Sequence, residues 1–129
     1  MQKIRLTTCG NYKFLTNPLD TYVGKSLEVY GEWSHGELSS ISSLVQKDAN
    51  IIEVGSNIGA HTVFIAKEIC PEGNVYAFEP RRIIFQNLCA NLCINDISNV
   101  HAFQKALGLD FDIIFEGPIP QDGLVNHGA

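Results

Sequence analysis

The chain has 129 residues, a formal net charge of −5, 45% hydrophobic residues and 18% charged residues. This is the composition of about one ordinary globular domain, and it excludes a mainly disordered chain, because the apolar side chains offset the entropy of ordering the backbone. Proteins that bind nucleic acid through bulk charge carry a basic excess, so the acidic balance predicts no nucleic-acid partner. No apolar run approaches the roughly 20 residues that span a bilayer, so we expect no membrane partner.

The first 33 residues predict an N-terminal segment of mostly irregular structure. Two short strands are expected at residues 5–8 and 12–15, on either side of a turn at Gly10 and Asn11. Turn signals farther along, including Gly24, predict that the rest of the segment has no regular structure.

A helix is expected from Ser34 to about Gln46. Ser34 and Glu37 have the spacing of a capping box, and apolar residues then recur at helical intervals. We interpret residues 34–116 as the main domain and residues 117–129 as a tail.

Strands and helices alternate after this helix. Short apolar strands are expected at residues 51–54, 75–78 and 100–103, with helices at 58–70 and from Pro80 to about 94. This alternation predicts parallel βαβ units with right-handed crossovers. The predicted fold class is therefore α/β, a Rossmann-like doubly wound parallel sheet that is truncated after three to four strands. The first strand is apolar on both faces, which predicts a central strand covered by helices on each side.

The residues that carry chemistry lie where the first of these strands meets the next helix. The sequence E-V-G-S-N-I-G at 53–59 places Gly55 where a ligand can approach the backbone, and Gly59 where a helix can pack closely. Glu79 follows the second strand, 20 positions after Gly59. Because an acidic residue at about this spacing accepts ribose hydroxyls, the pattern predicts a nucleoside site.

The same loop argues against a phosphate-bearing ligand. It lacks both the middle glycine of a dinucleotide loop and the Gly-Lys pair of a phosphate loop. Glu53 at the end of the strand would repel a phosphate but can hold a cation. The ligand that fits is S-adenosylmethionine, which carries a ribose, a sulfonium and an amino group and no phosphate.

The motifs resemble those of class I S-adenosylmethionine-dependent methyltransferases and, more narrowly, of the FkbM family, over roughly residues 28–108. The matching stretches are Y-G-E-W-S-H-G-E at 30–37, I-E-V-G-S-N-I-G-A-H-T at 52–62, F-E-P at 78–80 and N-L-C-A-N-L at 87–92. The resemblance implies O-methylation of a sugar or another small molecule.

The resemblance also implies which residues hold the cofactor. These are Glu53, Gly55, Ser56, Asn57, Gly59, Phe78, Glu79, Pro80 and Ala106. It further places Lys105 near the adenine edge and lets Glu32, Trp33 and Glu37 approach from the N-terminal segment. Structural roles compete with these assignments: Glu53 or Asn57 can cap the next helix, the capping box alone explains Glu37, and packing explains Trp33. No residue can be assigned as the catalytic base.

The four cysteines are expected to be packing thiols in a cytoplasmic protein. So apolar a chain does not need disulfides, and the N-terminus has no apolar block that would make a signal peptide. Cys89 and Cys93 are four positions apart on a predicted helix, but no histidine or acidic residue shares their face. We therefore expect no metal site.

The length suits a cofactor-binding half and is short for a substrate-binding half, so independent catalysis is not expected. In the methyltransferase sheet the strand order is 3-2-1-4-5, and without strand 4 the edge at residues 51–54 would be open. We expect that edge to be covered by residues 111–115 or by a second chain, as in a homodimer. An alternative is a non-catalytic half-Rossmann module that binds a nucleoside cofactor or oligomerises, and a nicotinamide-dinucleotide domain is the third hypothesis.

Overall fold

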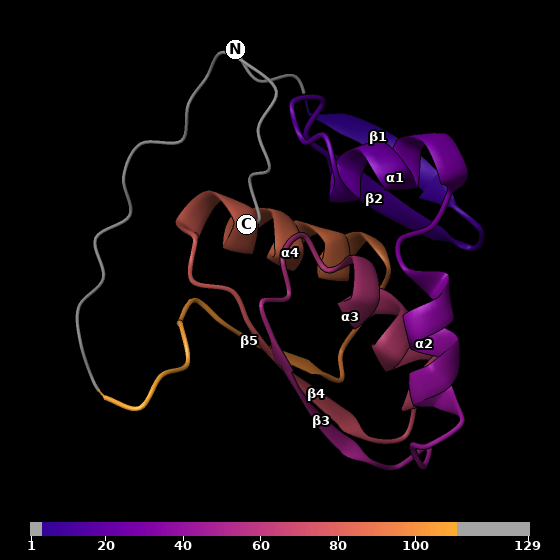
Figure 1. Cartoon of the computed structure of the whole chain (residues 1–129), viewed down its shortest axis with the longest axis vertical. Coiled ribbons are helices and arrows are strands. Elements are labelled where there is room, and N and C mark those ends of the chain that lie inside the picture. Colours follow the sequence, from indigo (N-terminus) through magenta and orange to yellow (C-terminus); the bar gives the residue numbers. More distant parts are fainter. Residues whose placement is uncertain (1–3, 111–129) are drawn as a thin grey trace.

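A computed structural model describes residues 4–110 of the chain (Figure 1). In chain order its elements are β1 (Arg5–Cys9), β2 (Tyr12–Thr16), α1 (Val23–Tyr30), α2 (His35–Ser42), β3 (Asn50–Val54), α3 (Ala60–Phe64), the π-helical turn η1 (Ile65–Ile69), β4 (Asn74–Phe78), α4 (Arg82–Ile94) and β5 (Val100–Phe103). The expected hairpin and the expected alternation of strands and helices are both present. Within the described residues no helix is long and apolar enough to cross a membrane.

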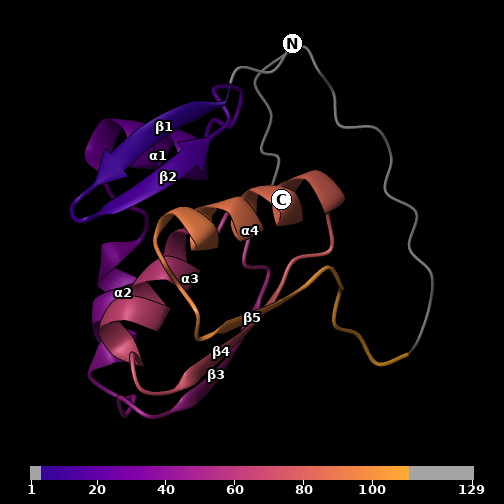
Figure 2. The ribbon, with the colours of Figure 1, turned by 180° about the vertical axis from the view of Figure 1, so that it is seen from behind.

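The main sheet is parallel and has the order β3-β4-β5 (Figures 1 and 2). Ile52 of β3 lies opposite Tyr76 of β4, which in turn lies opposite His101 of β5. The two crossovers step in the same direction across the sheet, so right-handed connections place α3 and α4 on the same face. Both ribbon views show these helices on one side of the three strands. The predicted α/β class and parallel order are confirmed.

The opposite face of this sheet is open in the described part of the chain, which corrects the expectation of a central strand covered on both sides. Side chains alternate along each strand, and Ile52 and Val54 point away from the helices with 67% and 63% of their surface exposed. On the same face the rings of Tyr76 and His101 stack with centroids 5.1 Å apart. Among residues 4–110, β3 also has no strand neighbour on its outer edge. The segment 111–115, expected to cover that edge, lies outside the described residues.

The core consists of two buried clusters that meet at the sheet. One joins the N-terminal hairpin and α1 to α4, and the other lies between α2, η1 and β4. Their buried members are Cys9, Phe14, Val23, Leu27, Ile58, Ala60, Val63, Ala77, Ile84, Leu88 and Leu92 in the first, and Leu38, Ile65, Ala66, Ile69, Cys70 and Val75 in the second. Cys9 and Cys70 thus pack in the core as expected, whereas Cys93 is exposed.

The N-terminal segment contains a helix, α1, where irregular structure was expected. Asp20 makes this possible, because its carboxylate accepts the backbone N–H groups of Tyr22 at 2.9 Å and of Gly24 at 2.9 Å. These donors are among those that the first turn of a helix leaves without a backbone partner. The prediction failed because Gly24 suggested a turn, whereas here it lies against the Asp20 side chain.

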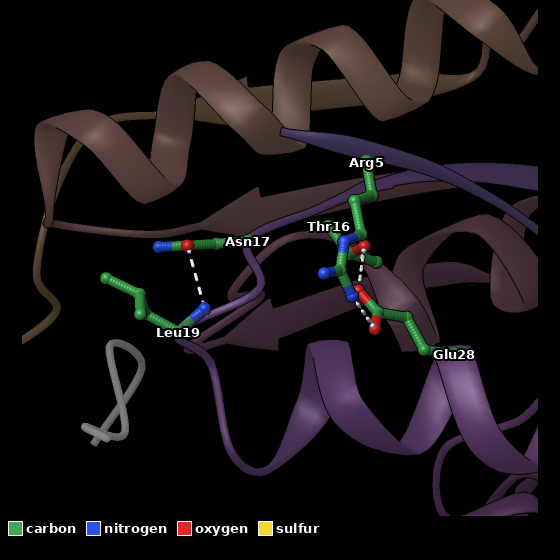
Figure 3. Close-up of polar contacts among 5 residues, drawn as sticks. All are labelled: Arg5, Thr16, Asn17, Leu19 and Glu28. Carbon is green, nitrogen blue, oxygen red and sulfur yellow. Dashed lines mark hydrogen bonds and ion pairs between the residues drawn. The ribbon is translucent and has the colours of Figure 1, made fainter. Parts of the chain in front are cut away.

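A polar cluster joins α1 to the hairpin (Figure 3). Glu28 of α1 accepts a hydrogen bond from Thr16 Oγ1 at 2.8 Å and forms an ion pair with Arg5 at 3.1 Å. At the end of β2, Asn17 Oδ1 accepts the N–H of Leu19 at 3.0 Å and turns the chain toward α1. The hairpin and α1 therefore form one packed unit.

The helix after this unit differs from its prediction at both ends. The capping box at Ser34 is not formed, since Ser34 adopts a left-handed φ of 53° and makes no side-chain cap. Instead, Glu32 accepts the N–H of His35 at 2.8 Å. At the other end α2 stops at Ser42, four residues before Gln46. Serine hydroxyls there donate to backbone carbonyls, as Ser42 does to Ser39, which competes with continuation of the helix.

Candidate functional site

The loop at residues 55–59 joins β3 to α3 at the carboxyl end of the sheet, and its backbone is unusually constrained. Gly55, Asn57 and Gly59 all have positive φ, at 80°, 51° and 87°. The N–H groups of Gly55 and Ser56 both donate to the carbonyl of Phe78, at 2.8 and 3.0 Å. The loop is thereby held against the end of β4.

The two glycines of the loop have different surroundings. A Cβ atom on Gly55 would meet nothing within 4 Å, so this position leaves open space beside the backbone. A Cβ atom on Gly59 would lie 2.7 Å from Leu88 Cδ1, so this position is needed for close packing of the loop on α4. Only glycine adopts such φ values at little cost. The close packing expected at Gly59 is present, and the approach of a ligand at Gly55 stays a prediction.

Glu79 is brought to the loop from the end of β4 and is 96% buried, with 4% of its surface exposed. Its Oε2 accepts the N–H of Asn57 at 3.0 Å, and its Oε1 accepts the N–H of Arg81 at 2.9 Å. Each carboxylate oxygen can accept a second hydrogen bond. Two backbone donors thus fix the orientation of this carboxylate, and within residues 4–110 each of its oxygens has one hydrogen-bond partner.

Glu53 lies at the end of β3, beneath the same loop. Its Oε2 accepts a hydrogen bond from Thr62 Oγ1 at 2.6 Å. Burial raises the pKa of the Glu53 carboxyl, and the hydrogen bonds from Thr62 and Ser56 and the nearby His61 oppose the rise. Because burial is the largest of these effects, a cation placed near Glu53 would stabilise its ionised form.

His61 is the second residue of α3 and lies near the carboxylates of Glu53 and Glu37. Its Nε2 is buried and, in the described part of the chain, accepts or donates no hydrogen bond. The nearest acid is Glu37, whose Oε2 is 4.0 Å away. Thr62 lies in the matching stretch at 52–62 but was assigned no role of its own. Its one signal was a polar residue inside an apolar helix, one turn from the loop.

The remaining predicted residues are less closely connected. Phe78 stacks on Phe103 with ring centroids 5.0 Å apart, and Pro80 is exposed. Lys105 and Ala106 are exposed and follow β5 at the same edge of the sheet as the loop, without a recorded side-chain contact to it.

The N-terminal candidates have structural contacts. Trp33 packs against the first core cluster, and Glu32 caps α2. Between residues 4 and 110 no group of three or more metal-binding side chains comes together. The loop at 55–59 is therefore flanked by two carboxylates, that of Glu79, which is bonded to the loop backbone, and that of Glu53, which is bonded to Thr62 of α3. This arrangement suits hydroxyl donors at Glu79 and a positive charge at Glu53.

No family model matches the chain. A curated relative, "Methyltransferase 1" of Beauveria bassiana (strain ARSEF 2860), is 26% identical over 98 residues. The match covers 73% of this chain and 39% of the relative, so the chain spans about two fifths of that protein.

Solved structures are similar over most of the described residues. A putative transferase from Pyrococcus horikoshii has a TM-score of 0.63 at 14% identity, covering 82% of this chain and 37% of that one. TYW2 from M. jannaschii, solved in complex with AdoMet, has a TM-score of 0.57 at 18% identity, covering 79% and 43%. The tRNA m1G37 methyltransferase from M. jannaschii has a TM-score of 0.57 at 13% identity, covering 82% and 30%.

These structures correct the expectation that nucleic acid is excluded. Besides the tRNA enzyme above, they include an rRNA methylase from Streptococcus thermophilus and a complex of aTrm5 with tRNALeu. The expectation was wrong because net charge describes the chain as a whole, whereas an RNA partner can be bound by other parts of a larger enzyme. At these identities the likeness shows the fold: the described residues form the Rossmann-like α/β fold of S-adenosylmethionine-dependent methyltransferases, over a part of its full length.

Proposed function

We propose that this chain binds S-adenosylmethionine at the loop of residues 55–59, with Glu79 and Glu53 at the two ends of the ligand, as the cofactor-binding part of a methyltransferase. The observation that carries the proposal is the contact of Glu79 Oε2 with the N–H of Asn57, because it joins the acidic residue and the glycine loop in one site. The curated methyltransferase relative and the AdoMet complex of TYW2 support the same ligand.

At the ribose end, the Glu79 carboxylate accepts the hydroxyl groups. The backbone N–H groups of Asn57 and Arg81 hold this carboxylate in place, so little side-chain entropy is lost when the ligand binds. Phe78, half-buried and stacked on Phe103, is placed next to Glu79 in the chain, where an adenine ring would lie. Pro80 and Ala106 are proposed to lie beside the adenine as well.

At the methionine end, Glu53 faces the positive charge of the ligand. Its pKa is raised by burial, so the ionised form gains from a cation that replaces lost solvation. The open space beside Gly55 lets the ligand approach the backbone of the loop closely. When bound, the cofactor supplies an electrophilic methyl group, and the chain's own residues bind and orient it.

The proposal also includes three more specific points. They are membership of the FkbM family, O-methylation of a sugar or other small molecule, and a cytoplasmic location. The motifs at 52–62 and 78–80 support the family. The four free cysteines support a reducing compartment. The acceptor itself is tested by incubating labelled S-adenosylmethionine with sugars and with tRNA, and incorporation into tRNA alone would overturn the sugar assignment.

The cofactor proposal is tested by calorimetric titration of the wild-type chain, Glu79→Ala and Glu72→Ala with S-adenosylmethionine. Glu72 is a matched control because it is exposed and lies on the turn before β4. We expect Glu79→Ala to weaken binding by about 100-fold, because two hydrogen bonds to a charged group are lost, and Glu72→Ala to bind as the wild type does. Absence of binding by the wild type at millimolar ligand would overturn the proposal.

A further inference from the structure

Helix α4 faces β2 with a row of asparagines spaced four residues apart: Asn87, Asn91 and Asn95. Asn95 accepts the N–H of Lys13 at 2.9 Å and donates to the carbonyl of Lys13 at 2.7 Å. Asn91 accepts the N–H of Leu15 at 2.7 Å and donates to its carbonyl at 3.3 Å. Asn87 also donates to the carbonyl of Leu15, at 3.0 Å.

The spacing explains why a helix can pair with a strand here. Four helical residues rise about 6 Å and two strand residues rise about 6.8 Å, so Asn95 and Asn91 meet Lys13 and Leu15, which are two positions apart on β2. The side-chain amides thereby occupy the edge of β2 that β1 leaves open, as a third strand would. Both ribbon views show α4 running beside the hairpin.

Asn91 differs from the other two asparagines because it also reaches the loop of the candidate site. It is fully buried, at 0% exposed, and its Nδ2 donates to the carbonyl of Ile58 at 2.8 Å. Both of its N–H groups are therefore used, one on the hairpin and one on the loop. One amide group connects β2, α4 and the segment that precedes α3.

The carbonyl of Ile58 lies at a sensitive place in that loop. It stands between Asn57 and Gly59, whose φ angles of 51° and 87° are both in the left-handed region. A non-glycine residue such as Asn57 stays in that region when its surroundings determine its backbone strongly. The N–H of Asn57, in turn, is the donor that orients Glu79.

We propose that Asn91 is a positioning residue for the cofactor: by holding the Ile58 carbonyl it keeps the Asn57 N–H on Glu79, and it makes the N-terminal hairpin part of the binding site. This inference rests on the proposed binding of S-adenosylmethionine. Loss of the Asn91 amide leaves a buried carbonyl without a donor and frees the loop to rotate away from Glu79.

Two variants separate this role from simple stabilisation of the hairpin. Asn91→Leu removes the contacts to both hairpin and loop. Asn95→Leu removes hairpin contacts and a hydrogen bond to the backbone carbonyl of Asn91, but no contact to the loop. We expect both to lower Tm, and Asn91→Leu to raise the Kd for S-adenosylmethionine by about tenfold or more while Asn95→Leu changes it less than about threefold. Asn91→Ser, smaller and still polar, provides the same comparison if Asn91→Leu does not fold.

A second measurement needs no ligand. Hydrogen exchange at the Asn57 amide should be faster in the Asn91 variants than in wild type and unchanged in Asn95→Leu. Equal Kd values for the Asn91 and Asn95 variants, or unchanged Asn57 exchange in both Asn91 variants, would overturn the inference. If the wild type binds no S-adenosylmethionine, the proposed function fails, and Asn57 exchange alone then decides whether Asn91 positions the loop.

Discussion

The backbone N–H of Asn57 donates a 3.0 Å hydrogen bond to Oε2 of Glu79, across 22 positions of the sequence. The donor has a left-handed φ of 51°, and the acceptor is a carboxylate with 4% of its surface exposed. Each therefore depends on the other: the loop gives the carboxylate a donor, and the carboxylate stabilises a backbone conformation that is uncommon for residues other than glycine.

Replacement of Glu53 should separate stability from binding. Glu53→Gln keeps an oxygen that can accept from Thr62 and removes a carboxylate whose burial is unfavourable. At neutral pH we expect the variant to unfold a few degrees higher than the wild type, measured by calorimetry. The same variant should bind S-adenosylmethionine about tenfold more weakly, because the charge opposite the ligand's cation is lost. A variant that is less stable and binds equally well would contradict both roles.

The free energy of unfolding should depend on pH through the titration of Glu53. Burial raises its pKa above the ordinary value of 4.5, so the folded chain retains a proton that the unfolded chain releases. The contribution of this group to stability is fully present below that ordinary value and is lost as pH rises through the raised pKa. Denaturant unfolding of the wild type and Glu53→Gln at several pH values from about 4 to 8 measures the difference. We expect the advantage of the variant to grow with pH, and a constant difference would contradict the assignment.

Replacement of Gly59 by alanine should lower the free energy of unfolding more than the same replacement of a glycine outside the site. Gly59→Ala forces a Cβ atom to within 2.7 Å of Leu88 Cδ1 at a φ of 87°. We expect a loss of about 1–3 kcal/mol of unfolding free energy from overpacking and backbone strain. Gly36→Ala is the control, since Gly36 lies in α2 and its added Cβ would meet nothing within 4 Å. That change should be neutral or slightly stabilising in the same denaturant titration, and equal losses in both variants would be evidence against the packing role.

The sequence was sufficient to predict those parts of the fold in which the local pattern is long. β4, α4 and β5 matched their predictions within one or two residues because their apolar positions repeat at strand or helix intervals. The short helix α1 was missed because its start depends on the side chain of Asp20. The capping box failed because Ser34 adopts a left-handed backbone and the N–H of Glu37, which its hydroxyl would accept, donates to the Ser34 carbonyl instead.

The candidate site, like the fold, could be predicted from the sequence only in part. Glu79 could be predicted because its separation from Gly59 is a property of one βαβ unit. Thr62 could not be assigned to Glu53, nor Asn91 to Ile58, because these contacts depend on how helices pack on the loop. Within the described residues Ile52 and Val54 are exposed, which was also not predicted. An apolar strand has the same sequence pattern whether or not a second layer covers that face of the sheet.

The most direct test of the central claim is an NMR titration of the wild-type chain with S-adenosylmethionine, followed through the backbone amide signals. The account predicts that the largest shifts occur at Gly55, Asn57 and Glu79, which lie at the carboxyl ends of β3 and β4 and share the hydrogen bond between loop and carboxylate. Unchanged spectra at millimolar ligand, or shifts confined to residues far from this loop such as Lys13 and Asn95, would contradict it.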